Sequence, residues 1–199
     1  MILVIDSSST TTALALLDGG DAVVADVTRP SGRDLDLPAL AAGIADPKQL
    51  TAVAVATGPG SFTGLRVGAA YAVGIALGRR IPLRTLGSLE VQRERARRPA
   101  TALVEAGRGR VYFLTPEGDT GLADVTEVPG DAPGVGWLRP ETAARLNFEL
   151  LAAAELRSFG EAAARLVAMA PEVPCDRVSL RYMQSFGWHA KAGAGPQAP

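Results

Sequence analysis

Hydrophobic and polar positions follow two periods along this chain, and the periods predict where strands and helices lie. Short apolar runs bounded by turn residues predict buried strands, whereas apolar positions spaced three and four apart predict helices. In the first half these rules predict strands over 2–6, 13–17, 22–28, 52–56 and 82–86, and helices over 37–45, 62–80 and 88–98. In the second half they predict strands over 101–105, 111–115 and 121–128, a loop over 129–136, and helices over 140–147 and 158–169.

The order of these elements occurs twice. A three-strand meander opens the chain, with Gly19-Gly20 as a hairpin signal, and a second meander begins after Pro99. We therefore expect an N-terminal lobe over 1–98 and a C-terminal lobe over 99–189. The segment 190–199 is rich in Gly, Ala and Pro and is expected to be disordered. Two lobes with this order are typical of the actin-like ATPase (ASKHA, RNase H-like) fold, so we predict an α/β protein with a reduced second lobe.

The most informative segment, 57–78, combines a strand end, a glycine-rich loop and a helix. Gly58 and Gly60 allow backbone angles closed to other residues, and a helix N-terminus can bind an anion. However, Gly64 is followed by Leu65 rather than by Lys and Ser or Thr, so the loop is not a Walker A motif. The glycine spacing also differs from GxGxxG. The motif alone favours a structural turn over a phosphate site, with Ser61 as a candidate helix cap.

The helix that follows is apolar almost all round, which is typical of a helix covered on more than one side. One stripe of small residues would let another backbone approach closely, and it comprises Gly64, Gly68, Ala72 and Ala76. A neighbouring apolar stripe suits the chain's own sheet and comprises Leu65, Ala69, Val73 and Leu77. The cover for the small-residue stripe is either another subunit or the chain's own helix over 37–45.

Composition limits the chemistry. The chain of 199 residues has a formal net charge of -1, one cysteine (Cys175) and one histidine (His189). A nucleic-acid binder usually carries a basic excess, so we expect any nucleic-acid contact to be shared with a partner. One cysteine rules out an internal disulfide. One cysteine and one histidine are too few for a zinc site. The single histidine lies near the end of the chain, which argues against a Ser-His or Cys-His pair. The N-terminus has no signal-peptide pattern and no apolar run approaches a membrane span, so the expected compartment is the cytoplasm.

Two further groups of residues have a functional and a plain interpretation. Asp6 ends the first strand where actin-like ATPases place a carboxylate facing Mg-nucleotide, and Ser7 follows it in a hydroxyl-rich turn. The plain interpretation, which we prefer, is that Asp6 caps the turn. The arginines of the segment 93–98 could contact tRNA or an acidic partner, but a solvated helix face with ion pairs is the better explanation.

The segment GPGSFTGLRVG, residues 58–68, resembles the signature of the TsaB family, also called YeaZ. The opening VIDSSSTTTALALL is similar to the family's first hairpin, and EAGRGRVY, residues 105–112, is similar to its second-lobe DARRGEVY stretch, with Glu105 in place of Asp. The resemblance covers residues 1 to about 115. The stretch before 52–56 is shorter than in the family, and near the end only Leu180, Arg181 and Tyr182 echo its pattern.

The resemblance implies a pseudo-enzyme with an actin-like fold, no catalytic residue, no metal and no cofactor of its own. Such proteins pair with the catalytic subunit TsaD and with the ATPase TsaE, and the system attaches threonylcarbamoyl to N6 of adenosine 37 in tRNA. The family pairs through its first two helices, either as a heterodimer or as a homodimer. The positions that match this interface are Leu37, Leu40, Ile44, Phe62, Leu65, Gly68, Tyr71 and Ala72.

Three alternatives stay open beside the scaffold subunit. The chain could be an actin-like ATPase or small-molecule kinase that binds nucleotide at Asp6, Ser7, Gly58 and Gly60, and ATP or ADP with Mg could also bind at the complex. A peptidase is the second alternative, against which the lack of a usable histidine or metal site argues. A diverged paralogue without the tRNA role is the third.

Overall fold

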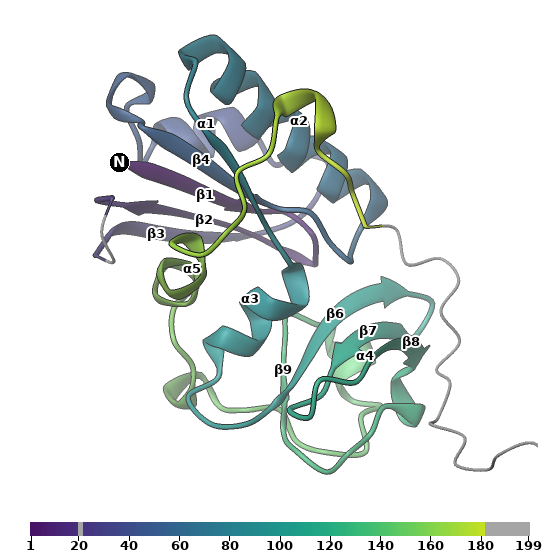
Figure 1. Ribbon diagram of the computed structural model, residues 1–199. Helices are drawn as coiled ribbons and strands as arrows, with labels where there is room; N and C mark the ends of the chain where they lie inside the picture. Colours follow the sequence, from purple (N-terminus) through teal and green to yellow (C-terminus); the bar gives the residue numbers. More distant parts are fainter. Residues whose placement is uncertain (20–21, 182–199) are drawn as a thin grey trace, which may run out of the picture.

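The computed structural model describes residues 1–19 and 22–181, which form two mixed β-sheets with a helix between them (Figure 1). The described residues do not include Gly20 of the predicted hairpin, Tyr182, His189 or the predicted tail over 190–199. Gly19 itself has a φ of +100°, which is the left-handed geometry that the hairpin signal implied.

The first sheet has the order β3-β2-β1-β4-β5. Its strands are β1 (Ile2–Asp6), β2 (Thr11–Leu17), β3 (Val23–Pro30), β4 (Ala52–Ala56) and β5 (Leu83–Leu86). β1, β2 and β3 form the predicted antiparallel meander, and β4 and β5 add in parallel. β2 begins at residue 11, earlier than predicted, because its first two threonines pair with the end of β3.

Both faces of the first sheet are buried at its centre, which explains why β1, β2 and β4 are apolar at nearly every position. Helices α1 (Leu37–Ala42) and α2 (Phe62–Arg79) cover one face, where Leu3 and Ile5 of β1 point. Helix α5 (Phe159–Val167) covers the other face. Residues of the expected C-terminal lobe, 99–189, therefore pack on the first sheet and also form the second sheet.

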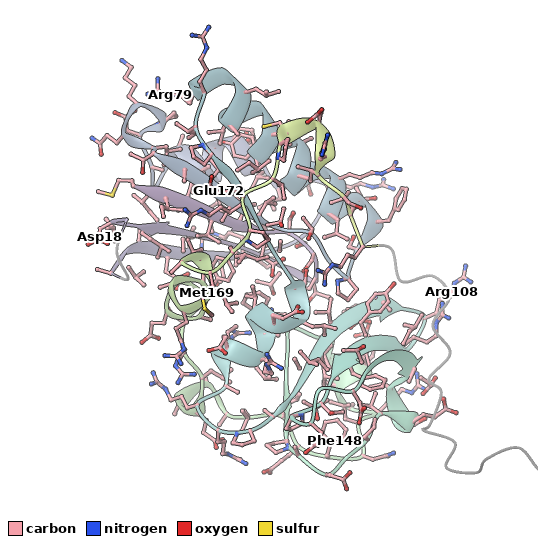
Figure 2. The ribbon with its side chains drawn as sticks, viewed as in Figure 1. Asp18, Arg79, Arg108, Phe148, Met169 and Glu172 are labelled. Carbon is pink, nitrogen blue, oxygen red and sulfur yellow. The ribbon has the colours of Figure 1, made fainter. Side chains whose placement is uncertain are left out.

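The second sheet has the order β8-β7-β6-β9. Its strands are β6 (Thr101–Gly107), β7 (Arg110–Leu114), β8 (Thr120–Asp124) and β9 (Gly134–Val135). The meander β6-β7-β8 matches the predicted repeat. β9 lies in the stretch predicted as a loop, because two residues among prolines and glycines carry no strand period. Figure 2 shows Arg108 at the outer end of the β6–β7 turn and Phe148 at the far side of this sheet.

Helix α3 (Ser88–Arg95) lies between the two sheets and packs on β6, β7 and α5. It is shorter than predicted, and its N-cap is Gly87. α1 also ends early, at a C-cap glycine, and α4 (Pro140–Ala143) is a single turn. Single 3₁₀ turns complete the structure as η1 (Pro47–Gln49), η2 (Val125–Glu127), η3 (Ala153–Glu155) and η4 (Cys175–Arg177).

The segment 171–181 returns to the first sheet and runs past β5 to the glycine-rich loop, with Glu172 beside β5 (Figure 2). Thr85 N–H donates to the Pro171 carbonyl, and Arg181 N–H donates to the Thr57 carbonyl. The half-buried Cys175 packs against the core beneath this segment. Among the described residues, no helix has the length and apolar character needed to cross a membrane.

Candidate protein interface on helix α2

The glycine-rich loop and the start of α2 pack directly on the turn between β1 and β2. A β-carbon on Gly60 would overlap the Ser8 carbonyl, and one on Gly64 would overlap the Ser7 carbonyl. A β-carbon on Gly68 would overlap the Ser7 hydroxyl. The glycines of the motif are therefore explained by close backbone approach, as the structural interpretation of the motif predicted. Ser61 caps α2 by accepting a hydrogen bond from Gly64 N–H at 3.2 Å, which confirms its expected role.

The four residues proposed for nucleotide binding lie around this same contact. Asp6 is buried, and its Oδ1 accepts a hydrogen bond from Ser8 N–H at 2.9 Å, which is the turn cap that we preferred. The Ser7 hydroxyl donates to the Gly64 carbonyl at 2.8 Å. Gly58 has a φ of +110° and faces the Arg181 carbonyl. The loop and the turn are thus in direct contact through Gly60 and Ser8.

Burial raises the pKa of the Asp6 carboxyl, an effect that contacts with Ser8 and the charge of Arg95 partly oppose. Arg95 belongs to the basic segment that we expected to face solvent, but it is buried. Its guanidinium lies 4.1 Å from the centroid of the Trp137 ring. The exposed-face interpretation is therefore wrong for Arg95. Arg97 and Arg98 are exposed and pair with Glu161 at 3.8 Å and Glu155 at 2.9 Å, but they lie beyond the end of α3 and not on a helix face.

The small-residue stripe of α2 is covered by the chain itself. Gly68, Ala72 and Ala76 are buried against β1, β4 and the β1–β2 turn, and so are Leu65 and Ala69. This corrects the assignment of that stripe to a partner, and it removes Leu65, Gly68 and Ala72 from the surface that a partner can reach. Because this helix is apolar on all sides, its hydrophobic pattern does not show which face meets the sheet.

The opposite face of α2 is exposed and apolar. The described residues include five exposed large hydrophobic side chains, and three of them lie on α2: Phe62 at 48%, Val67 at 48% and Leu77 at 60%. The guanidinium of Arg66 lies 3.8 Å above the Phe62 ring. Sequence reasoning placed Leu77 on the sheet side and did not single out Val67. Ten residues correspond to about 2.8 helical turns, so the spacing of Val67 and Leu77 gave no signal of a shared exposed face.

A shallow groove runs along the C-terminal half of this exposed face. It is lined by Pro47, Ala70, Tyr71, Gly74, Ile75, Gly78 and Arg79. Gly74 and Gly78 have open space where a β-carbon would stand, so the groove floor is low and accessible. Figure 2 shows Arg79 pointing outward at the end of α2. Small residues flanked by apolar side chains form a surface onto which another helix can pack closely.

Helix α1 lies on the same face of the sheet as α2. Its predicted interface residues differ in exposure, since Leu37 is buried whereas Leu40 and Ile44 are half-buried. Burial raises the pKa of Tyr71 on α2, and the charge of Asp36 at the start of α1 adds to this effect. α1 and α2 pack against the same core cluster of the first sheet.

A hydroxyl-rich pocket opens beside the β1–β2 turn, between that turn and the start of α2. Its polar side chains are Ser7, Ser9, Thr12, Ser31, Arg33, Ser61 and Thr63. In the described part of the chain, no three His, Cys, Asp or Glu side chains are grouped as metal ligands would be. The acidic residue of the EAGRGRVY stretch, Glu105, is engaged internally, because it accepts hydrogen bonds from Arg139 and from the Thr142 hydroxyl.

These features define a class of protein, namely a two-sheet α/β protein with an apolar helix face on its surface. Two solved structures share the fold. YeaZ from Pseudomonas aeruginosa matches with a TM-score of 0.66 and 21% identity over 91% of this chain and 98% of that chain. A second structure, described as an uncharacterized protein with similarity to peptidase YEAZ from Pseudomonas aeruginosa, has a TM-score of 0.68 and 21% identity over 92% and 99% of the two chains.

The family follows from sequence. The family model described as TsaD, tRNA N6-adenosine threonylcarbamoyltransferase, matches residues 39–146, more than half of the chain. The tRNA threonylcarbamoyladenosine biosynthesis protein TsaB of Bacillus subtilis (strain 168) is 32% identical over 120 residues, which span 56% of this chain and about half (52%) of that protein. The chain belongs to the TsaB/YeaZ family of tRNA threonylcarbamoyladenosine biosynthesis.

Proposed function

We propose that this protein is a non-catalytic subunit that binds a TsaD-like catalytic subunit during threonylcarbamoylation of adenosine 37 in tRNA. The two sheets would then correspond to the two lobes of an actin-like fold, and the contact would use the exposed face of α2 together with α1. A TsaE-like ATPase and the tRNA would join only in the complex, in which nucleotide could also bind.

One observation carries this proposal. Three of the five exposed large hydrophobic side chains of the described residues lie on a single helix face. Large exposed apolar side chains gathered on one helix are typical of protein–protein contacts, because their exposure to water is unfavourable. The groove beside Gly74 and Gly78 supports a helix as the contacting element.

The absence of a catalytic role is supported by the polar groups of the candidate site. Asp6 is buried and caps a turn, and the Ser7 hydroxyl donates to a backbone carbonyl. Neither group faces a general base among the described residues, so neither has the arrangement of an activated nucleophile. A formal net charge of -1 also supports a role in which other subunits supply most of the contacts to tRNA.

The experiment is co-expression with the TsaD-like protein of the same genome, followed by size-exclusion chromatography with light scattering. The wild-type chain is expected to form a one-to-one complex. Val67→Arg places a charge on the exposed face of α2 and is expected to abolish the complex, because a buried unpaired charge is costly at an interface. Gly68→Arg would not serve, since Gly68 is buried inside the chain.

Val24→Arg is the matched control. Val24 is a valine of similar exposure, 52%, but it lies on β3, away from α2. Both variants should keep the circular dichroism spectrum of the wild type. Loss of the complex in both variants, or in neither, would contradict the placement of the interface on α2. Separate peaks for the wild-type proteins would contradict the scaffold role itself.

A further inference from the structure

A cavity of about 490 Å³ opens where the end of α3 and the segment that leads into α5 meet β3 of the first sheet. α3 and α5 lie side by side (Figure 1). The polar residues that line the cavity come from three separate parts of the chain, namely Asp26 and Thr28 of β3, Arg95 of α3, and Arg157 and Ser158 before α5. A cavity of this size can hold a small organic molecule.

The two arginines of the cavity are fixed next to each other by hydrogen bonds to the end of α3. Arg157 N–H donates to the Arg95 carbonyl at 2.6 Å. The guanidinium of Arg157 is anchored there too, because its Nη1 donates to the carbonyls of Glu94 at 2.9 Å and Ala96 at 2.6 Å. The guanidinium of Arg95 lies 4.1 Å from the centroid of the Trp137 ring, and Trp137 also lines the cavity. Residues distant in sequence thus bring two positive charges to one cavity.

Neither of these charges is paired within the protein. In the described part of the chain, no carboxylate oxygen lies within 4.0 Å of the guanidinium of Arg95 or of Arg157. Arg165 on the neighbouring α5, by contrast, pairs with Glu94 at 2.7 Å. Arg95 is only 9% exposed, and a buried charge without a close counter-charge is unfavourable. The cavity therefore suits a ligand that brings a negative charge.

The formal charges around the cavity indicate how much negative charge it takes. Burial lowers the pKa of Arg95 to about 10, against the opposing charges of Asp6 and Asp26, so the guanidinium stays positive at neutral pH. Asp26 is held at the mouth of the cavity, where its Oδ2 accepts a hydrogen bond from Gly160 N–H at 2.7 Å. With Arg95 and Arg157 positive and Asp26 negative, the lining has a net charge of about +1. One singly charged anion balances it, whereas a phosphate dianion would be repelled by Asp26.

The remaining lining residues are mostly apolar. They include Trp137, Leu156 and Phe159, which lie in the same cavity as the two arginines. A guanidinium group binds a carboxylate through parallel N–H donors, and apolar side chains favour an apolar group beside it. The cavity thus combines the two features that a small organic acid requires.

We propose that this cavity binds a small monocarboxylic acid, with the carboxylate on Arg95 and Arg157 and the apolar part against Leu156 and Phe159. Such a ligand would contact β3, α3 and the start of α5 together with Trp137, which follows the second sheet in the chain. The site does not depend on the partner contact proposed above, because α5 and α2 cover opposite faces of the first sheet.

Fluorescence of Trp137 gives the test. The chain has two tryptophans, so Trp188→Phe leaves Trp137 as the only one in the full-length protein. Titration with 4-methylpentanoate and with phenylacetate at constant ionic strength is expected to change its emission in a saturable way. Acetate, which lacks the apolar part, should bind more weakly than either acid. No saturable change with either acid would overturn the proposal, and so would binding of inorganic phosphate as tight as that of the acids.

A pair of arginine substitutions in the same background assigns the site. Arg157→Gln is expected to raise the Kd for the acids about tenfold or more, because it removes a charged donor to the carboxylate. Arg97→Gln is the matched control, since Arg97 is an exposed arginine near the end of α3 that pairs with Glu161 and does not line the cavity. It should leave the Kd unchanged. Equal effects of the two substitutions would contradict the placement of the site.

A substitution with the opposite expected sign keeps the test valid if Arg157→Gln does not fold. Asp26→Asn retains an oxygen that can accept from Gly160 N–H and raises the net charge of the lining to about +2. It is expected to lower the Kd for the acids by about threefold, because it removes a negative charge near the bound carboxylate. An unchanged or higher Kd in this variant would overturn the charge balance on which the proposal rests.

Discussion

Gly64 and Ser7 are in direct contact, with the first turn of α2 resting on the backbone carbonyl of the β1–β2 turn and no room for a β-carbon between them. The Ser7 hydroxyl returns a hydrogen bond of 2.8 Å to the Gly64 carbonyl. This contact fixes the helix relative to the sheet, and it thereby determines which face of α2 remains on the surface.

A methyl group at this contact should be costly. Gly64→Ala is expected to lower the free energy of unfolding by about 2 kcal/mol, because the overlap forces the helix away from the turn. Gly74→Ala, in the same helix but with open space at its β-carbon, should instead raise it by about 0.5 kcal/mol through helix propensity. Urea unfolding of both variants measures the contrast, and equal effects would show that Gly64 is not at a close contact.

The buried carboxylate of Glu105 makes Arg139 important for stability. Glu105 accepts hydrogen bonds from the guanidinium of Arg139, at 3.1 Å from Nε, and from the Thr142 hydroxyl at 2.8 Å. Arg139→Ala is expected to cost about 2 kcal/mol of unfolding free energy, since it removes charged hydrogen bonds from a buried acceptor.

Arg145 provides the comparison for Arg139. It forms two hydrogen bonds with the exposed Asp124, at 2.9 and 3.0 Å. Arg145→Ala should cost at most about 1 kcal/mol, because surface ion pairs contribute little. Chemical denaturation of the two variants side by side provides the measurement. A larger loss for Arg145→Ala than for Arg139→Ala would mean that burial of Glu105 does not govern the difference.

Asp6 should make stability depend on pH in a defined direction. Burial raises the pKa of this carboxyl in the folded state above its ordinary value of 3.8. The folded state therefore holds the proton more tightly than the unfolded chain does. The resulting contribution to stability is fully present below pH 3.8 and is lost as the pH rises through the folded-state pKa.

The Asp6→Asn variant isolates this effect, because asparagine does not titrate. The free energy of unfolding of the wild type, relative to that of the variant, is expected to fall as the pH rises from about 4 towards 7. Denaturant titrations at several pH values give the two curves. A constant difference across this range would show that the pKa of Asp6 is not raised.

The returning segment 171–181 should stabilise the first sheet. It bonds to β5 through the Thr85 N–H and through the Val173 N–H, which donates to the Leu83 carbonyl at 2.9 Å. Truncation after Ala170 removes these bonds and uncovers the core beneath Val173 and Cys175. The expected loss is about 3 kcal/mol or more in unfolding free energy.

A second truncation serves as the control. Ending the chain after Arg181 retains every described contact of the segment, including the bond from Arg181 N–H to the Thr57 carbonyl at 2.8 Å. This variant should unfold at the same denaturant concentration as the full chain. If both truncations have the same effect, the segment 171–181 does not stabilise the sheet.

The sequence by itself determined the strands and the order in which they follow one another. β4 is apolar at every position and β1 at every position before Asp6, and this pattern is strong because both faces of their sheet are buried here. The two meanders were predicted for the same reason. β9 was not predicted, because its two residues are too few to show a strand pattern and pair with β6 only in the folded chain.

Tertiary structure alone decided which side of α2 faces outward. Both of its faces are apolar in sequence, so local periodicity could not separate the buried Gly68 from the exposed Val67. The contact of Gly64 with Ser7 settled the rotation of the helix, because only glycine allows so close an approach. The tertiary structure also decided that Arg95 is buried, since Asp6 and Trp137 are distant from it in sequence and come near it only in the folded chain.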